Sequence, residues 1–178
     1  MEIIKTDFEG LFVLQTVNFQ DNRGGFQKLF NFDFFVENGL DSDFKEFYYS
    51  VNNKNVRRGM HFQIPPYDHT KVVYVSKGHI LDVCVDIRKK SDTFGKCFSI
   101  HLDDQKAQYL YIPKGFAHGF LSLEEGSIVN YAQTSCYNKE CDCGILQDSI
   151  DFDWGIEKPI ASGRDLLFPK LSDFDSPF

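Results

Sequence analysis

The sequence lacks the features of a membrane protein, a secreted protein and a general nucleic-acid binder. No stretch approaches 18 consecutive apolar residues, so we expect no transmembrane helix. The first residues, Met1–Asp7, show no basic region followed by an apolar run, which predicts no signal peptide and a cytoplasmic protein. With 26 acidic and 19 basic residues, the formal net charge is −7, which argues against nucleic acid as a partner.

Cysteine is sparse and irregularly spaced. The five thiols are odd in number and suggest no disulfide framework, in keeping with a cytoplasmic location. Cys84 lies in an apolar, strand-like run and is predicted to be a core thiol. Cys141 and Cys143 form a CxC pair that could bind a metal ion, but no second pair stands at the spacing of a zinc site. We therefore expect no metal site, with this pair as an alternative.

Several motifs of common enzyme classes are also missing. There is no GxGxxG or Walker phosphate loop and no GxSxG nucleophile elbow. His61 is followed by Phe62 and Gln63, so the His-x-His pair of a metal-binding barrel is absent, although His118 could meet His61 from another strand. What remains is histidine as proton acceptor, tyrosine as proton donor, and lysine or arginine as electrostatic stabilisers. This set suits proton abstraction next to a carbonyl, where an enolate is held and reprotonated.

The apolar residues that are present predict one folded, all-β domain over residues 1–178. Hydrophobic residues make up 42% of the chain, including 19 Phe and 8 Tyr, which can fill a substantial core. Strand-like segments recur about every ten residues and are separated by turns such as Lys77-Gly78 and Pro113–Gly115. This pattern is typical of a β-sandwich or jelly-roll barrel. From about residue 148 the chain is less regular and is predicted to wrap the barrel.

One short helix is expected before this tail, over residues 33–38. Asn31 can cap its first turn, and Gly39 can adopt the left-handed conformation after its last turn. Strands are predicted at Leu11–Leu14, Phe26–Phe30, Val72–Val75, Leu81–Ile87, Leu110–Ile112, Phe116–Leu121 and Ile128–Gln133.

A dense group of cationic and proton-transferring residues lies in the middle of the chain. The run Arg57–Gln63 contains two arginines and His61, and Lys71 follows within fifteen residues of its start. In an acidic protein such a group predicts a local positive pocket for a dianionic ligand, where negative charge can build up on oxygen. A solvated basic loop with one incidental histidine is the alternative, and these residues alone leave both open.

Seven segments in order resemble the dTDP-4-dehydrorhamnose 3,5-epimerase family. The resemblance extends from about residue 7 to residue 170 and implies a cupin (jelly-roll) fold. It also implies a homodimer, a nucleotide-sugar substrate and a reaction that needs no metal or other cofactor. The segments are Asp21–Phe26, Asn55–Gln63, Lys71–Val73, Asp82–Arg88, Ser91–Gly95, Ile112–Phe120 and Asn130–Tyr131.

The resemblance implies roles for individual residues. His61 matches the catalytic base and Asp165 the carboxylate that orients it, while Tyr131 matches the proton donor on the opposite face of the sugar. Lys71 matches the group that faces the C4 oxygen. Among the substrate contacts, the resemblance places Arg23 and Arg58 on the phosphates and Tyr137 against the nucleobase. The full set of implied substrate contacts is Arg23, Phe26, Lys28, Glu46, Tyr48, Arg58, Gln63, His118, Tyr137 and Arg164.

Each of these residues also has a purely structural interpretation. His118 between two phenylalanines can be a hydrogen-bonded core histidine, Tyr131 an ordinary tyrosine, and Asp165 a solvated tail residue. The ordered set of motifs favours the functional interpretation.

The sequence departs from the family pattern on the nucleotide side of the site. Lys28 stands where an acidic residue is usual, and Glu46 and Tyr48 stand where Gln and Asn are usual. Arg164 replaces a lysine and keeps its charge. The resemblance thus implies retained chemistry on a nucleotide and sugar that remain to be identified.

The function expected is a cofactor-independent epimerase that inverts C3, C5 or both in a nucleotide-linked 4-keto-6-deoxy sugar. Such a reaction belongs to the synthesis of rhamnose-type deoxysugars or surface polysaccharides. The alternatives are an epimerase of C3 alone or C5 alone acting on a non-thymidine nucleotide sugar, a sugar-binding cupin without turnover, and a metal-dependent cupin oxygenase.

Overall fold

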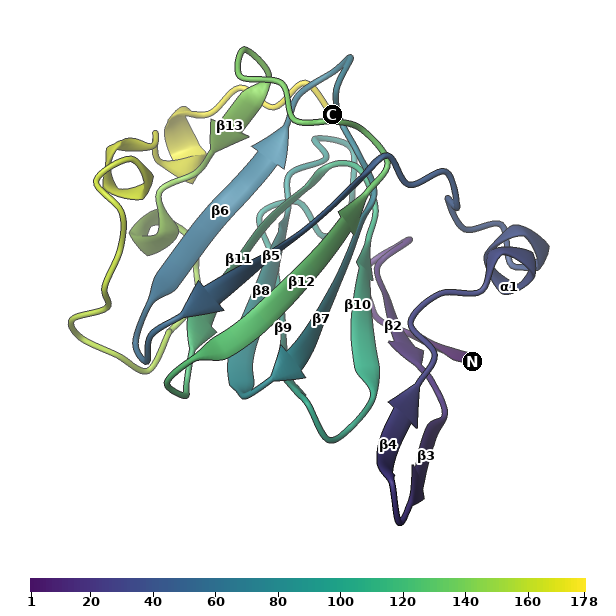
Figure 1. Ribbon diagram of the computed structural model, residues 1–178. Coiled ribbons are helices and arrows are strands. Elements are labelled where there is room, and N and C mark those ends of the chain that lie inside the picture. Colours follow the sequence, from purple (N-terminus) through teal and green to yellow (C-terminus); the bar gives the residue numbers. More distant parts are fainter.

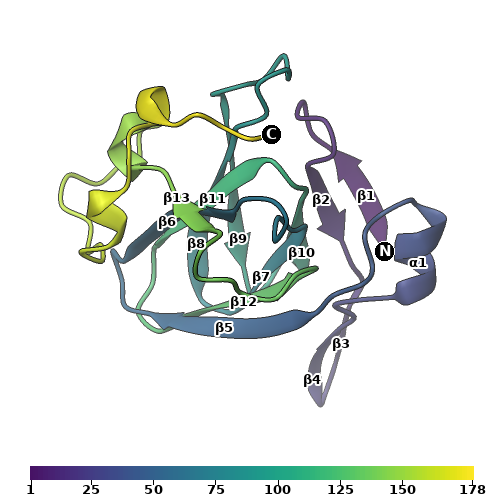
Figure 2. The ribbon, with the colours of Figure 1, turned by 90° about the horizontal axis from the view of Figure 1, so that it is seen from above.

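Two antiparallel β-sheets lie face to face in the computed structural model, which describes residues 1–178 (Figures 1 and 2). One sheet has six strands in the order β1-β2-β10-β7-β12-β5, and the other has five in the order β13-β6-β11-β8-β9. Strands β3 and β4 form a separate hairpin. The strands are β1 (Glu2–Lys5), β2 (Phe12–Gln15), β3 (Asn18–Asp21), β4 (Gly24–Gln27), β5 (Glu46–Asn52), β6 (Arg57–Gln63), β7 (Lys71–Lys77), β8 (His79–Asp86), β9 (Cys97–Asp103), β10 (Gln108–Ile112), β11 (Phe116–Ser122), β12 (Ser127–Gln133) and β13 (Asp142–Gly144). This arrangement is the cupin jelly roll that the sequence predicted.

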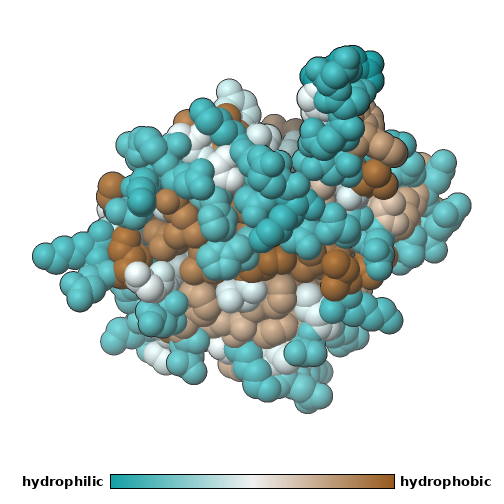
Figure 3. All heavy atoms as spheres, turned by 90° about the horizontal axis from the view of Figure 1, so that it is seen from below, coloured by the Kyte–Doolittle hydropathy of each residue, from teal (hydrophilic) through white to brown (hydrophobic).

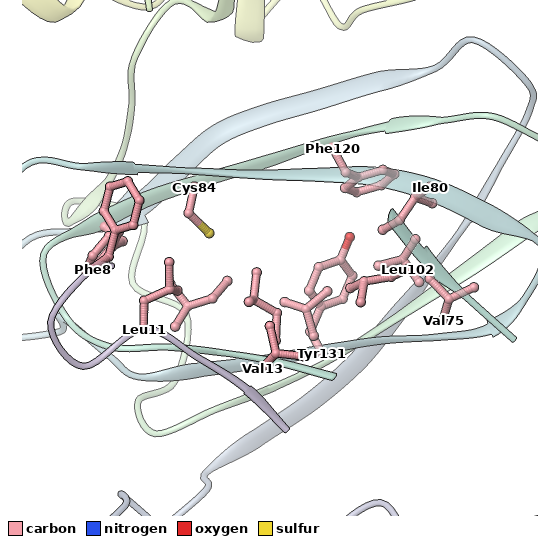
Figure 4. Close-up of a cluster of buried hydrophobic side chains, with 14 residues drawn as sticks. Phe8, Leu11, Val13, Val75, Ile80, Cys84, Leu102, Phe120 and Tyr131 are labelled. Atoms are coloured by element: carbon pink, nitrogen blue, oxygen red, sulfur yellow. The ribbon is translucent and has the colours of Figure 1, made fainter. Parts of the chain in front are cut away.

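The main core lies between the two sheets (Figure 4). Leu11 and Val13 from the six-stranded side face Cys84 and Phe120 from the five-stranded side, and all four are buried. Figure 4 also shows Tyr131 among these side chains, with its hydroxyl pointing toward the opposite sheet. The prediction of Cys84 as a core thiol is confirmed.

The tail covers the outer face of the five-stranded sheet. Ile150 and Trp154 share a buried cluster with Val83 and Val85 of β8, and Phe174 packs against this cluster, so the strand is buried on both faces. The tail also contains the 3₁₀-helices η1 (Gln147–Ser149), η2 (Asp165–Leu167) and η3 (Leu171–Asp173). The predicted wrapping is confirmed, and it brings η2 against β6.

Helix α1 (Phe32–Glu37) covers the other sheet through Phe35, which contacts buried residues on the outer face of the six-stranded sheet. Asn31 caps it by accepting a hydrogen bond from the Phe34 amide, and Gly39 has φ of +68°. The predicted helix and its two caps are confirmed, and the helix begins and ends one residue earlier than predicted. No helix in the chain has the length and apolar character needed to cross a bilayer.

One predicted strand was wrong in its extent. We expected a strand over Phe26–Phe30, but β4 ends at Gln27. Beyond that point the aromatic ring of Phe30 packs edge-on against Phe35 and Phe44, with ring centroids 4.8 and 5.5 Å apart. Tertiary packing of Phe30 therefore replaces the strand pairing that its β propensity suggested.

Candidate active site

A cavity of about 420 Å³ opens on the inner face of the barrel. Its walls come from β5, β6, β7, β11 and β12, with further residues from β13 and the tail. Most of the predicted site residues line it, namely Glu46, Tyr48, Arg58, His61, Gln63, Lys71, His118, Tyr131, Tyr137 and Arg164.

His61 is bonded to a buried carboxylate from the tail. Nε2 of His61 lies 3.0 Å from Oδ1 of Asp165, and the other carboxylate oxygen accepts a hydrogen bond from the Gly59 amide at 3.1 Å. Burial alone would raise the pKa of Asp165, but the hydrogen bonds from His61, Gly59 and Ser162 outweigh it and lower the pKa. The ionised carboxylate accepts the Nε2 proton and leaves Nδ1 of His61 unprotonated, so Nδ1 is the atom that can act as a base.

The backbone around His61 depends on two glycines. Strands β6 and β11 pair irregularly between His118 and Phe120, and Gly59 has φ of +125° there. A Cβ on Gly59 would lie 2.5 Å from the Cα of Gly119, and a Cβ on Gly119 would lie 2.6 Å from the Arg58 oxygen. This close approach requires glycine on both strands and sets His61 directly opposite His118 in the register.

Lys71 presents an ammonium group with no partner of its own. The residue is 7% exposed and lines the cavity at the start of β7, and its side chain makes no hydrogen bond or ion pair within the chain. Burial lowers its pKa, while Asp82 and Asp142 act in the opposite direction. An unpaired buried cation at a cavity wall is suited to stabilising an oxyanion on a ligand.

Tyr131 supplies the phenol on the β12 wall. Its Oη lies 3.4 Å from Oγ of Ser50, and its ring is stacked on Tyr48 at 4.7 Å between centroids. Burial raises the pKa of Tyr131, so the phenol is protonated at neutral pH and can donate a proton. The cavity therefore holds an oriented imidazole, an unpaired ammonium and a protonated phenol.

His118 is both a hydrogen-bonded core histidine and a residue of the cavity wall, which the sequence left as alternatives. Its Nε2 lies 2.8 and 3.0 Å from the two oxygens of Asp82, and both residues are buried. It also lines the cavity. Burial lowers the pKa of His118 against the opposing effect of Asp82. Sequence reasoning missed Asp82 as part of the site; the signal was an acidic residue inside an apolar strand, where a carboxylate needs a partner.

The two cavity arginines differ in how they are held. Nε of Arg58 donates to Oδ1 of Asn52 at 2.8 Å, which fixes the guanidinium and leaves its terminal nitrogens for a ligand. Arg164 pairs with Asp142 at 2.6 Å and lies over the Phe168 ring. Asn52 and Asp142 were not predicted, because polar residues of this kind occur throughout the sequence.

Gln63 and Glu46 secure the loop that carries Tyr137. Oε1 of Gln63 accepts a hydrogen bond from the Asn138 amide at 2.6 Å. Oε2 of Glu46 accepts hydrogen bonds from the Tyr137 amide and from the Gln133 side chain, both at 2.8 Å.

His69, on the same side of the cavity as Lys71, is a neutral imidazole. Burial and the Lys71 charge lower the pKa of His69 to about 3.

Three predicted substrate contacts lie away from the cavity of their own chain. Arg23, Phe26 and Lys28 lie on or next to the β3–β4 hairpin, which projects from the barrel (Figure 1). The Arg23 side chain is 86% exposed and pairs with Asp21. In the view from below, hydrophobic residues reach the surface across the middle of this face, between hydrophilic ones (Figure 3). Within one chain, the structure does not bring these three residues to the other site residues.

The five cysteines are all free, including Cys141 and Cys143 of the CxC pair. No group of three or more His, Cys, Asp or Glu side chains lies close enough together to hold a metal ion.

Comparisons with known proteins agree with this geometry. The sequence profile described as dTDP-4-dehydrorhamnose 3,5-epimerase matches residues 5–173. The enzyme of that name from Methanothermobacter thermautotrophicus is 42% identical over 92% of this chain and 87% of its own, and the one from Escherichia coli K12 is 40% identical over 96% and 91%. The crystal structure of dTDP-6-deoxy-D-glucose-3,5-epimerase from Legionella pneumophila, in complex with dTDP-4-keto-L-rhamnose, is 31% identical. It covers 98% of this chain and 94% of its own, with a TM-score of 0.92. The chain belongs to the dTDP-4-dehydrorhamnose 3,5-epimerase family of isomerases.

Proposed function

We propose that the protein inverts C3 and C5 of a dTDP-linked 4-keto-6-deoxy sugar, as a step in the synthesis of a rhamnose-type deoxysugar. The observation that carries this proposal is the unpaired Lys71 ammonium in the same cavity as the His61–Asp165 pair and the protonated Tyr131. The names of the relatives support both the nucleotide and the two inverted carbons.

The reaction uses the acidity that the C4 ketone gives to the protons on C3 and C5. Nδ1 of His61 takes one proton, and the electron pair of the broken C–H bond moves toward the C4 oxygen to form an enolate. Lys71 stabilises the charge on that oxygen. Tyr131 then donates its proton to the carbon from the opposite face, and the carbonyl re-forms. Solvent reprotonates the phenolate and takes the proton from the His61 imidazolium, which restores both groups. A positioned acid or base contributes about 10²–10⁴-fold and a donor at the oxyanion about 10²–10³-fold, so neither is sufficient alone.

The diphosphate is assigned to the arginine side of the cavity. Arg58 is fixed by Asn52 and can offer two parallel N–H groups to paired phosphate oxygens. Arg164 can join it once a phosphate competes with Asp142 for its guanidinium. Tyr137, which also lines the cavity, is assigned to the nucleobase of the substrate.

We infer a homodimer in which the hairpin of one chain reaches the cavity of its partner. The exposed rings of Phe19 and Phe26 support this, with centroids 6.5 Å apart on a hairpin that has no sheet partner in its own chain. Mixing two inactive variants, Arg23→Ala and His61→Ala, tests it. Mixed dimers regain activity if Arg23 serves the partner's cavity, and they stay inactive if it serves its own.

We also propose that residues 1–178 form one domain that acts in the cytoplasm without a cofactor. The core shared by the two sheets supports the single domain. The five free cysteines are consistent with a reducing compartment.

The decisive experiment is proton NMR in deuterated water with a panel of 4-keto nucleotide sugars that differ in base and sugar. The expected result is deuterium at C3 and C5 of the dTDP-linked 4-keto-6-deoxy sugar, with inversion at both carbons. Inversion at one carbon alone would identify a single-site epimerase. Absence of exchange with every sugar would leave a binding cupin without turnover.

Tyr131→Phe separates the two faces in the same assay. It should abolish inversion while deuterium exchange survives at the carbon facing His61. Loss of exchange with His61 intact would contradict the assignment of base and acid to opposite faces.

A further inference from the structure

The inner face of β5 touches several functional groups of the cavity at once. Its side chains alternate, so Phe47, Tyr49 and Val51 are exposed on the outside while Glu46, Tyr48 and Ser50 line the cavity. Ser50 lies beside the Tyr131 hydroxyl, and Glu46 holds the Tyr137 amide. Tyr48 lies between these two contacts, directly opposite Tyr131 in the β5–β12 register.

The ring of Tyr48 is stacked on the ring of Tyr131. The centroids are 4.7 Å apart and the planes differ by 17°. Tyr131 also meets the edge of the His118 ring, at 6.4 Å and 72°. Two rings of different orientation therefore restrict how Tyr131 can move, because tilting it toward either one brings atoms into contact.

A chain of hydrogen bonds holds Tyr48 itself. Its hydroxyl donates to Oε1 of Gln133 at 3.2 Å, and Nε2 of Gln133 donates to Oε2 of Glu46 at 2.8 Å. Although Tyr48 is 42% exposed as a residue, desolvation of its hydroxyl raises its pKa, so it remains an uncharged phenol beside the neutral Tyr131. Tyr48 is thus anchored at its hydroxyl end and contacts Tyr131 through its ring face.

We propose that Tyr48 is a positioning residue for Tyr131, whose ring holds the phenol at the angle from which it returns the proton to the sugar carbon. The inference deepens the proposed epimerase function and rests on it. It assigns the effect to the ring of Tyr48, since the ring face is the part that contacts Tyr131.

A pair of variants tests this assignment. Tyr48→Ile removes the ring but keeps a residue that favours strands, and Tyr48→Phe keeps the ring without the hydroxyl. Because a displacement of about 1 Å can cost about 10²-fold in rate, we expect Tyr48→Ile to lower kcat for inversion by about 10- to 100-fold. The ratio of deuterium exchange to inversion should rise by the same factor with KM unchanged, since proton removal by His61 does not use Tyr131. Tyr48→Phe keeps the ring that contacts Tyr131, so it should keep the wild-type ratio of exchange to inversion.

Two results would overturn the proposal. If Tyr48→Ile raises KM with kcat and the ratio unchanged, Tyr48 only binds substrate. If Tyr48→Phe raises the ratio of exchange to inversion as much as Tyr48→Ile does, the hydrogen bond to Gln133, and not the ring, positions Tyr131. Thermal unfolding of both variants checks that they are folded.

A measurement without turnover keeps this inference separate from the proposed function. In fluorotyrosine-labelled protein, the ¹⁹F resonance of Tyr131 is assigned by its loss in Tyr131→Phe. It should shift and broaden in Tyr48→Ile and stay sharp in Tyr48→Phe. An unchanged Tyr131 signal in Tyr48→Ile would refute the positioning role. A wild-type protein that fails to exchange deuterium with any sugar would instead refute the epimerase function.

Discussion

Asp165 follows His61 by 104 residues in the chain, yet its carboxylate lies 3.0 Å from Nε2 of that imidazole. The same carboxylate also accepts the Gly59 amide of β6. The tail therefore helps to build the candidate active site, because it holds both the ring of His61 and the strand that carries it.

Replacing Asp165 should stop the reaction at its first step. The amide of Asp165→Asn can donate to Nε2 of His61, which would move the proton to Nδ1 and remove the lone pair that acts as base. We expect exchange and inversion to fall together, by about 10²–10⁴-fold in kcat. Deuterium exchange by NMR measures both. Asp173→Asn, which changes an exposed carboxylate in the same tail, is the control and should keep full activity. Normal exchange in Asp165→Asn would show that this carboxylate does not orient the base.

Lys71→Met should separate activity from stability. Loss of the oxyanion partner should slow exchange and inversion by about 10²–10³-fold. Burial lowers the pKa of Lys71, which means that the folded protein holds the charged form less well than the unfolded chain does. Removing the charge should therefore leave the free energy of unfolding at neutral pH unchanged or higher, as measured by urea denaturation. A variant that is unstable and fully active when folded would contradict both expectations.

The same direction of shift predicts how wild-type activity depends on pH. Lys71 should lose its proton at a pH below the ordinary lysine value of 10.5. The rate should therefore decline on the alkaline side before an unperturbed lysine would titrate, and this decline should be absent from the residual activity of Lys71→Met. A pH–rate profile of both proteins tests it.

Asp86 should stabilise the fold in a pH-dependent way. This buried carboxylate binds Arg88, Ser91 and Thr93, and their hydrogen bonds lower its pKa despite burial. Asp86→Asn should reduce the free energy of unfolding by about 1.5–3 kcal/mol at pH 7. Because the folded pKa lies below 3.8, this contribution is complete above that pH and is lost as the pH falls further. The difference between variant and wild type should shrink in acid. The control is Asp43→Asn, which breaks the exposed pair with Lys45 and should change nothing measurable.

Gly119→Ala should damage the pairing of β6 with β11. Its Cβ would lie 2.6 Å from the Arg58 oxygen and 2.7 Å from Sδ of Met60, so a strand must shift. We expect a loss of about 1–3 kcal/mol in unfolding free energy, together with reduced kcat because His61 and His118 lie on these strands. At Gly163 a Cβ would meet nothing within 4 Å, so Gly163→Ala is the matched control. Equal stability of the two variants would show that the strands can separate without cost.

The sequence alone determined the fold class and one helix with both caps. Strand-length apolar segments between Gly and Pro turns can bury their side chains only by packing sheets together, which is a local property of the pattern. Asn31 and Gly39 act on their own backbone, so the start and end of α1 could be predicted from neighbouring residues. The ordered motifs around His61, Lys71 and Tyr131 also indicate the family.

Which residues contact one another depends on long-range packing. The contacts of Asp82 with His118, of Asn52 with Arg58 and of Tyr48 with Tyr131 depend on strand register, and a shift of one residue would turn each side chain to the other face. The hairpin that carries Arg23 projects from the barrel (Figure 1), and only the path of the folded chain sets where it points. Local sequence favours a strand, a turn or a helix, whereas long-range packing sets which strands pair and what their side chains touch.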